Sequence, residues 1–235
     1  MTLRWLICFS LGVLPLAGAT VSGRVELRDS RDPGVRNHKD YSGVVIALKP
    51  VEGATPQATD KHATMLQKDK TFSPHVLAIP AGSVVDFPNA DPIFHNAFSS
   101  YSGQVFDIGL YPPGTTRSVR FAREGVVRVF CNIHASMSAV IVVVGSPYFA
   151  STKRDGSFEI AGVPPGQYVM TVFHERASEG ALRDLSRKIT VGPDGASLPG
   201  LMISEAGYLS IPHKNKYGHE YSPESGDQAS YPGKK

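Results

Sequence analysis

Short apolar runs follow one another along most of the chain, and turn-forming residues separate them. The runs are rich in Val, Ile and Phe and occupy positions 21–27, 43–48, 76–79, 83–87, 116–121, 126–130, 139–144, 157–160 and 167–173. Gly, Pro, Asn or Asp bound each run, as is typical of strands joined by turns. Helical periodicity is nearly absent, and the best candidate helix is the short stretch 178–185. The pattern predicts an all-β protein built from sandwiches.

The first residues have the pattern of an export signal. Arg4 precedes an apolar stretch that ends with the small residues Ala17, Gly18 and Ala19. The stretch is short for a bilayer span and Pro15 interrupts it, so a cleaved signal over residues 1–19 is favoured over an uncleaved membrane anchor. We therefore expect an exported, periplasmic protein with no membrane span once the signal is removed.

From about residue 206 the chain changes character, becoming rich in Lys, His, Tyr, Pro, Ser and Gly with almost no aliphatic side chains. Such a segment buries too little apolar surface to offset its loss of chain entropy. An extended or disordered tail is therefore predicted for 206–235, unless it wraps around the body. His213 and His219 lie in this tail. They are expected to be solvated, and weak metal binding is the alternative.

Charge and cysteine content narrow the possible functions. The chain has 24 Lys and Arg against 21 Asp and Glu, which is too near neutral to suggest a nucleic-acid partner. Cys8 lies in the predicted signal, so the exported chain keeps Cys131 as its single thiol. A lone thiol in an oxidising compartment is a hazard unless something occupies it, and metal ligation is one such occupation.

The sharpest motif is Cys131-x-x-His134-x-x-Met137, which lies between the apolar runs 126–130 and 139–144. Thiolate and imidazole are strong ligands and a thioether is a weak one, a mixture that suits copper alternating between two oxidation states. Zinc would require a fourth strong ligand. Taken singly, each of these residues is more often a packing residue; taken together, they predict a copper site.

A second imidazole has to come from elsewhere in the chain, and His95 can provide it. It follows the predicted strand 83–87 and a turn rich in Pro, Asn and Asp. The two segments can converge at one end of a sandwich, giving two imidazoles and a thiolate around one ion with the thioether beside them.

Residues 60–145 resemble a cupredoxin domain, and the short ligand loop is most similar to that of amicyanin. The matching stretches are 72–74, 79–91, 95–96, 119–121 and 125–137. The resemblance implies a Greek-key sandwich that holds one type 1 (blue) copper. It makes His95 and His134 the imidazole ligands, Cys131 the thiolate and Met137 the axial ligand, with Asn96 tying the two ligand loops together. It also implies a non-enzymatic electron carrier that meets a redox partner protein, whose identity the sequence does not give.

His75 does not belong to this pattern. A structural or surface role is favoured for it. The alternative is an additional ligand, or a group that supports the ligands.

A second module is indicated near the C-terminus. Residues 152–168 have the pattern of a hairpin with an Asp-Gly turn, followed by a Pro-Pro-Gly turn and another strand. This stretch resembles the carboxypeptidase regulatory-like, transthyretin-type sandwich, which is noncatalytic. Because 146–205 is short for a whole sandwich, we predict that the runs within 20–55 supply the missing strands and that the cupredoxin is inserted between them. Two contiguous domains are the alternative.

Three functions are compatible with these features. One-electron transfer by a copper protein is the leading interpretation. Copper delivery, buffering or sensing without redox turnover is the second, and thiol catalysis by Cys131 and His134 is the third. Multicopper oxidase activity is disfavoured because the chain has no His-x-His pair.

Overall fold

The computed structural model of the 235-residue chain describes residues 18–53, 61–100, 103–210 and 212–221. The predicted signal, with Cys8, lies outside these residues except for Gly18 and Ala19, and residues 222–235 of the predicted tail also lie outside them. The first strand begins at Ala19.

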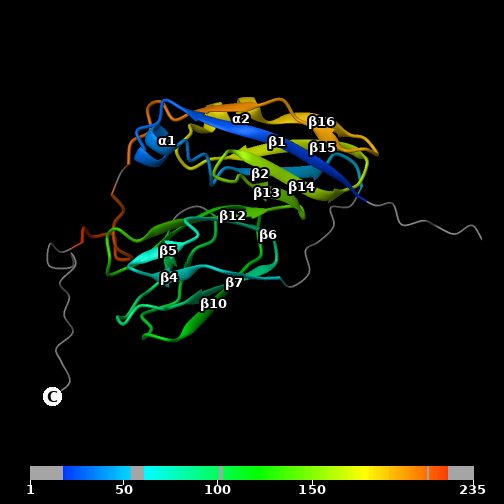
Figure 1. Cartoon of the computed structure of the whole chain (residues 1–235). Coiled ribbons are helices and arrows are strands. Elements are labelled where there is room, and N and C mark those ends of the chain that lie inside the picture. The colour runs from blue at the N-terminus through cyan, green and yellow to red at the C-terminus, as the bar shows by residue number, and fades with distance from the viewer. Residues whose placement is uncertain (1–17, 54–60, 101–102, 211, 222–235) are drawn as a thin grey trace, which may run out of the picture.

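The chain is nearly all β, as predicted, and it forms two bodies of layered sheets, one above the other in Figure 1. The strands are β1 (Ala19–Arg28), β2 (Val45–Pro50), β3 (His62–Thr64), β4 (Leu66–Lys68), β5 (Thr71–Ser73), β6 (Val76–Pro80), β7 (Ser83–Pro88), β8 (Phe98–Ser99), β9 (Phe106–Asp107), β10 (Thr116–Phe121), β11 (Gly125–Phe130), β12 (Ser138–Val144), β13 (Tyr148–Ser151), β14 (Ser157–Val163), β15 (Gly166–Phe173), β16 (Arg187–Val191), β17 (Ala196–Ser197) and β18 (Leu201–Ser204). Every predicted apolar run falls on one of these strands.

The outer body is formed by strands from both ends of the described chain, β1 and β2 together with β13 to β18. One sheet has the order β14-β1-β17, with β18 also pairing with β1, and the other has the order β13-β2-β15-β16. The two sheets enclose one hydrophobic core that includes Val25 of β1, Ile46 of β2 and Phe158 of β14. The runs predicted at 21–27 and 43–48 therefore pair with strands more than a hundred residues later.

The central body is formed by β3 to β12. Its main sheets have the orders β10-β7-β3 and β6-β12-β11-β8-β9, and a short hairpin of β4 and β5 lies beside them. Side chains from both sheets meet in a second core, among them Phe87 of β7, Phe121 of β10 and Val129 of β11. Cys131 and Met137 belong to this core, so the candidate ligands lie at the end of a packed sandwich.

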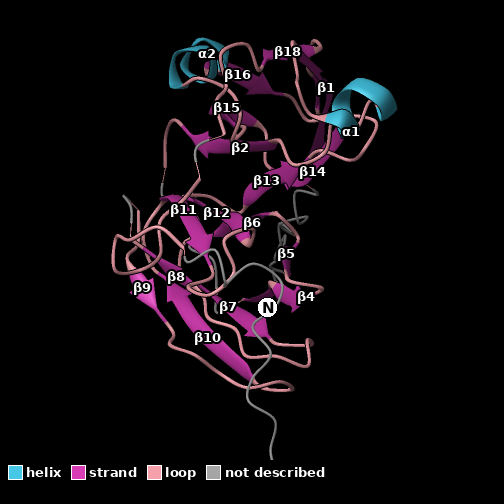
Figure 2. Cartoon of the chain, turned by 90° about the vertical axis from the view of Figure 1, so that its left-hand side faces the viewer, coloured by secondary structure: helices cyan, strands magenta, loops and turns pink. Residues whose placement is uncertain are grey.

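The two bodies meet along the faces of two sheets. Val140, Val142 and Val144 of β12 point away from the central core and form a third cluster with Val45 of β2, against which Phe173 packs. Figure 2 shows the sheet of β2 and β13 lying above β12 and β6. Strands β2 and β12 are thus covered on both faces, which is why their sequences are continuously apolar instead of alternating.

Two helices complete the described structure. The predicted helix at 178–185 is confirmed as α2 (Glu179–Leu185), whose first turn is capped by the side chain of Ser178. Helix α1 (Pro33–His38), capped by Asp32, was not predicted because six residues are too few to show a helical period. Neither helix in the described ranges has the length and apolar character needed to cross a membrane.

Candidate metal centre

The Cys131 loop is a tight connection between β11 and β12. The N–H of Cys131 donates to the carbonyl of Met137 at 3.1 Å, and the N–H of Met137 donates to the carbonyl of His134 at the same distance. These bonds close the loop on itself and bury the side chains of Cys131 and Met137 completely. The spacing of the motif therefore lets one short hairpin loop direct both a thiol and a thioether into the same core.

His95 meets this loop from the other side of the site, after the turn that follows β7. The ligand atoms of His95, Cys131 and His134 all lie within 4.8 Å of one another, and all three residues are buried. His134 Nδ1 is 3.7 Å from Cys131 Sγ, and the two imidazole rings have their centroids 4.9 Å apart. In the part of the chain that the structure describes, this is the single group of three or more His, Cys, Asp or Glu residues with such spacing.

The ring of His95 is oriented by a buried carboxylate. Nε2 of His95 lies 2.7 Å from Asp91 Oδ2, whereas Nδ1 is buried and has no hydrogen-bond partner among the described residues. Burial opposes ionisation of the carboxyl, but hydrogen bonds from the backbone N–H of Lys70, from the His95 ring and from the backbone N–H of Asp69 keep its pKa below the ordinary value. The carboxylate favours the tautomer protonated at Nε2, which leaves the Nδ1 lone pair open to an ion.

The sulfur of Cys131 is buried in the same place. Burial raises the pKa of the thiol, and backbone N–H groups of Ile133, Asn96 and His134 act in the opposite direction by hydrogen bonding to the sulfur. A cation at this position deprotonates a coordinating thiol, and the N–H groups then stabilise the thiolate. A thiol and two imidazoles, one of them with an unpartnered Nδ1, are therefore a donor set that fits copper.

Asn96 links the two ligand loops through its backbone. Its N–H reaches the sulfur of Cys131, whereas its side-chain Nδ2 donates to Asp107 Oδ1 at 2.7 Å. The predicted position of Asn96 beside the site is thus matched by a specific contact, with the side chain directed at a neighbouring carboxylate.

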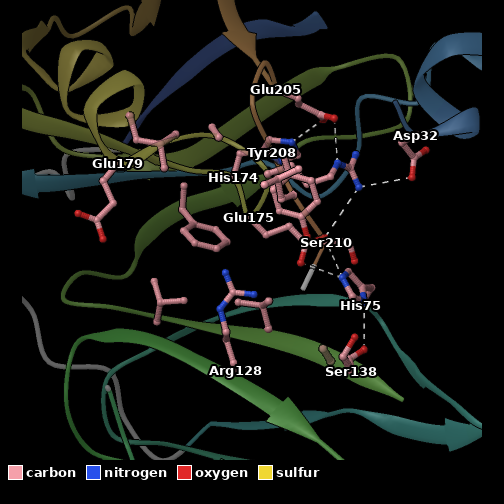
Figure 3. Close-up of a pocket in the computed structure, with 18 of the residues that line it drawn as sticks. Asp32, His75, Arg128, Ser138, His174, Glu175, Glu179, Glu205, Tyr208 and Ser210 are labelled. Carbon is pink, nitrogen blue, oxygen red and sulfur yellow. Dashed lines mark hydrogen bonds and ion pairs between the residues drawn. The ribbon is translucent and has the colours of Figure 1, made fainter. Parts of the chain in front are cut away.

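His75 lies outside the group of converging ligand atoms. Its Nε2 is 2.8 Å from Glu175 Oε1, and its Nδ1 is 3.1 Å from the carbonyl oxygen of Ser138 at the start of β12 (Figure 3). The hydrogen bond to Glu175 raises the pKa of His75 against the effect of burial. Because Glu175 belongs to the outer body, His75 joins the two bodies at the edge of their contact.

A cleft with a volume of about 1430 Å³ lies between the two bodies, beside the ligand loop. Figure 3 shows residues of both bodies around it, including His75, Arg128, His174 and Glu205. The cleft is lined by Phe130, Ala135 and Ser136 of the central body but by none of the candidate ligands. The candidate metal centre therefore does not open into this cleft.

The sequence did not reveal the part played by Asp91 or by the tail. Asp91 was noticed as a turn residue, and its spacing of four from His95 was the available signal. The expectation that His213 is solvated is wrong, since its ring is half-buried and stacks on Phe130 with centroids 4.2 Å apart. His219 is exposed, as expected.

Comparisons with known proteins match this chain to solved structures alone. No protein-family model matches it, and no curated protein does. The solved structures that it resembles include a purple cupredoxin from Nitrosopumilus maritimus, which is 26% identical and covers 35% of this chain and 99% of its own, with a TM-score of 0.32. A reduced variant of amicyanin is 14% identical over 42% of this chain and 98% of its own, with a TM-score of 0.34.

The copper-containing nitrite reductase of Thermus scotoductus SA-01 is 21% identical over 51% of this chain and 28% of the reductase, with a TM-score of 0.35. These likenesses are distant and partial. The interpretation of the site below therefore depends on its own geometry.

Proposed function

We propose that the chain binds one copper ion through His95, Cys131 and His134, with Met137 as a weaker fourth ligand, and that it carries single electrons. The observation that supports this most directly is the convergence of three buried donor atoms within 4.8 Å, one of them the unpartnered Nδ1 of His95. Copper supplies one-electron chemistry because it is stable in two oxidation states with these ligands.

The residues of the chain prepare the site before an ion arrives. Asp91 fixes the tautomer and ring orientation of His95, and the backbone of Asn96 reaches the sulfur of Cys131. The closed loop between β11 and β12 holds Cys131 and His134 at a short distance. Because the ligands are held by a packed core, they have little freedom to rearrange when the charge of the site changes, which is the condition for fast electron transfer.

The cellular setting is part of the proposal. An electron carrier needs a donor and an acceptor, so we expect at least one redox partner protein and no catalytic turnover of a small substrate. Export to the periplasm is supported by the pattern of residues 1–19. The likeness of the outer body to a regulatory-like sandwich stays a prediction.

The test is a copper titration of the purified protein, followed by absorption and paramagnetic-resonance spectra. One equivalent of Cu(II) should produce an intense thiolate-to-copper band at roughly 600 nm, as expected of a trigonal site with two imidazoles and one thiolate. Cys131→Ala should abolish the band. His75→Ala is the matched control and should leave it unchanged.

The same titration, together with alkylation of Cys131, distinguishes the competing functions. Tight binding of copper without the thiolate band would contradict electron transfer and favour copper delivery or buffering. Alkylation of Cys131 at the same rate with and without copper would favour thiol catalysis.

A further inference from the structure

The segment 212–221 has its own local structure. The side-chain oxygen of Asn215 accepts hydrogen bonds from the N–H groups of Tyr217 and His219 at 3.0 and 3.1 Å, and the N–H of Gly218 donates to the Asn215 carbonyl at 2.9 Å. Gly218 has a φ of +79°, which glycine adopts without strain. These bonds form an Asn-centred turn, so the segment is not a featureless tail. In Figure 1 it is the orange to red stretch that runs from the outer body to the end of the central body.

One set of contacts joins this segment to the Cys131 loop. The hydroxyl of Tyr221 donates to the backbone carbonyl of Cys131 at 2.5 Å. The N–H of Lys216 donates to Asn132 Oδ1 at 3.0 Å. Nearby, the ring of His213 stacks on Phe130, the residue that precedes the cysteine.

A second set reaches the loop that carries His95. Lys216 Nζ lies 2.8 Å from Asp107 Oδ2, and the other oxygen of that carboxylate accepts from the side chain of Asn96 at 2.7 Å. Asn96 follows His95 directly, and its own N–H reaches the sulfur of Cys131. A single residue of the segment, Lys216, is therefore connected to both ligand loops, through its backbone to one and through its side chain to the other.

We propose that residues 212–221 are a C-terminal strap that fastens the two metal-ligand loops to each other, with Lys216 and Tyr221 as positioning residues for Cys131. The two loops come from parts of the chain about thirty-five residues apart and meet at the end of the sandwich, where the described strands join them through one pair, Phe98 of β8 with Phe130 of β11. Hydrogen bonds from a third segment restrict the opening of such loops, because opening then has to break them as well.

This inference rests on the proposed function for its meaning, but it can be tested without copper. The thiol of Cys131 reports how often the ligand loop opens, since iodoacetamide reaches a fully buried sulfur through local unfolding. The variants are a chain that ends at Ser210, which lacks the strap, and Tyr221→Phe, which removes one hydroxyl and keeps the ring. His219→Ala is the control, because His219 lies in the same segment, is exposed, and joins the Asn215 turn through its backbone N–H.

In the metal-free protein, Tyr221→Phe should be alkylated about threefold to tenfold faster than the unchanged chain, the range expected for the loss of one hydrogen bond. The chain that ends at Ser210 should react faster still, and His219→Ala should react at the original rate. Equal rates in all four proteins would overturn the strap. If the shortened chain does not fold, Tyr221→Phe decides alone.

Copper then distinguishes the strap from the metal site itself. With copper bound, Tyr221→Phe should shift the reduction potential and the energy of the thiolate band, whereas His219→Ala should shift neither. If no variant binds copper but the alkylation rates still differ as expected, the strap stands and the proposed function fails. If all bind copper with one potential and one alkylation rate, the proposed function stands and the strap fails.

Discussion

Two buried histidines, one in each body, have nearly the same immediate surroundings. His95 in the central body and His174 in the outer body each hold a carboxylate at 2.7 Å through Nε2, Asp91 in one case and Glu205 in the other. Both residues are almost fully buried. In both, Nδ1 is buried without a hydrogen-bond partner in the described ranges.

The two histidines differ in the groups that lie around the ring and its carboxylate. Around His95, a thiol and a second imidazole converge on the open nitrogen. Around His174, the partner carboxylate of Glu205 is shared with Arg176 at 3.0 Å, and burial lowers the pKa of the imidazole despite that carboxylate. An imidazole fixed by a carboxylate is thus not a metal site by itself. What makes one is the convergence of other donors on its free nitrogen.

Replacing each imidazole in turn tests whether His95, and not His174, is needed for copper binding. His95→Ala should weaken copper binding by more than about a hundredfold, beyond the 10–100-fold loss typical for removing a group that supports a ligand. His174→Ala should leave copper affinity unchanged. Competition against a chelator of known affinity measures both. Equal losses in the two variants would mean that His95 is no ligand.

The carboxylates give the next largest effect. Asp91→Asn keeps the size of the side chain but no longer favours a proton on His95 Nε2, so copper affinity should fall by about 10–100-fold. Glu205→Gln is the matched change in the outer body, and it should leave the affinity within about twofold. An Asp91→Asn protein with full affinity would show that the tautomer of His95 is set by something else.

Removing the imidazole of the outer body should affect the stability of the protein. His174→Ala leaves the buried carboxylate of Glu205 without one of its partners, which should lower the free energy of unfolding by about 1–3 kcal/mol. Urea denaturation of the metal-free protein measures this change. An unchanged midpoint would indicate that water replaces the imidazole without cost.

The smallest expected effect is a dependence on pH at His75, the histidine that joins the bodies. Its pKa is raised by Glu175, so its contribution is fully present below its unfolded value of 6.5 and is lost as the pH rises through the raised folded value. The pKa of Glu175 is lowered, mainly by His75 and against burial, so the carboxylate stays charged down to below 4.5.

The coupling between His75→Gln and Glu175→Gln in a double-mutant cycle should therefore be largest near about pH 6 and shrink toward about pH 9. Because the ring of His75 is half exposed, the coupling should stay below about 1 kcal/mol. A coupling that is the same at both pH values would contradict the assigned ion pair.

Burial on one or both faces leaves an apolar run in the sequence, and the sequence predicted the strands that have a clear run of this kind. It missed β8 and β17, since two residues show no alternation, and also β16, most of whose residues are exposed. The pairing of β2 with β13 and β15 supports the proposal that the central body is inserted into the outer one. The chain enters the central body after β2 and leaves it before β13, and these two strands pair with each other, Leu48 with Tyr148, as such an insertion requires.

The convergence of the candidate ligands was predictable for a different reason. Cys131, His134 and Met137 share one loop, so their spacing along the chain is their spacing in space, and His95 follows from the order of the strands. Asp91 and Tyr221 act through hydrogen bonds whose partners in the site are fixed by tertiary structure. A polar tail with almost no aliphatic side chains gives no sequence signal for such contacts.

Strand β12 packs against both bodies through its two faces. Its odd-numbered side chains, such as Ile141, complete the core beside the metal centre, and its even-numbered valines complete the contact with the outer body. Unfolding of the outer body would expose the even-numbered valines, and unfolding of the central body would remove β12 from the outer sheet that it covers, so each body loses a buried contact when the other unfolds. Heating should therefore unfold both bodies in a single cooperative transition, with no stage at which the central body survives alone.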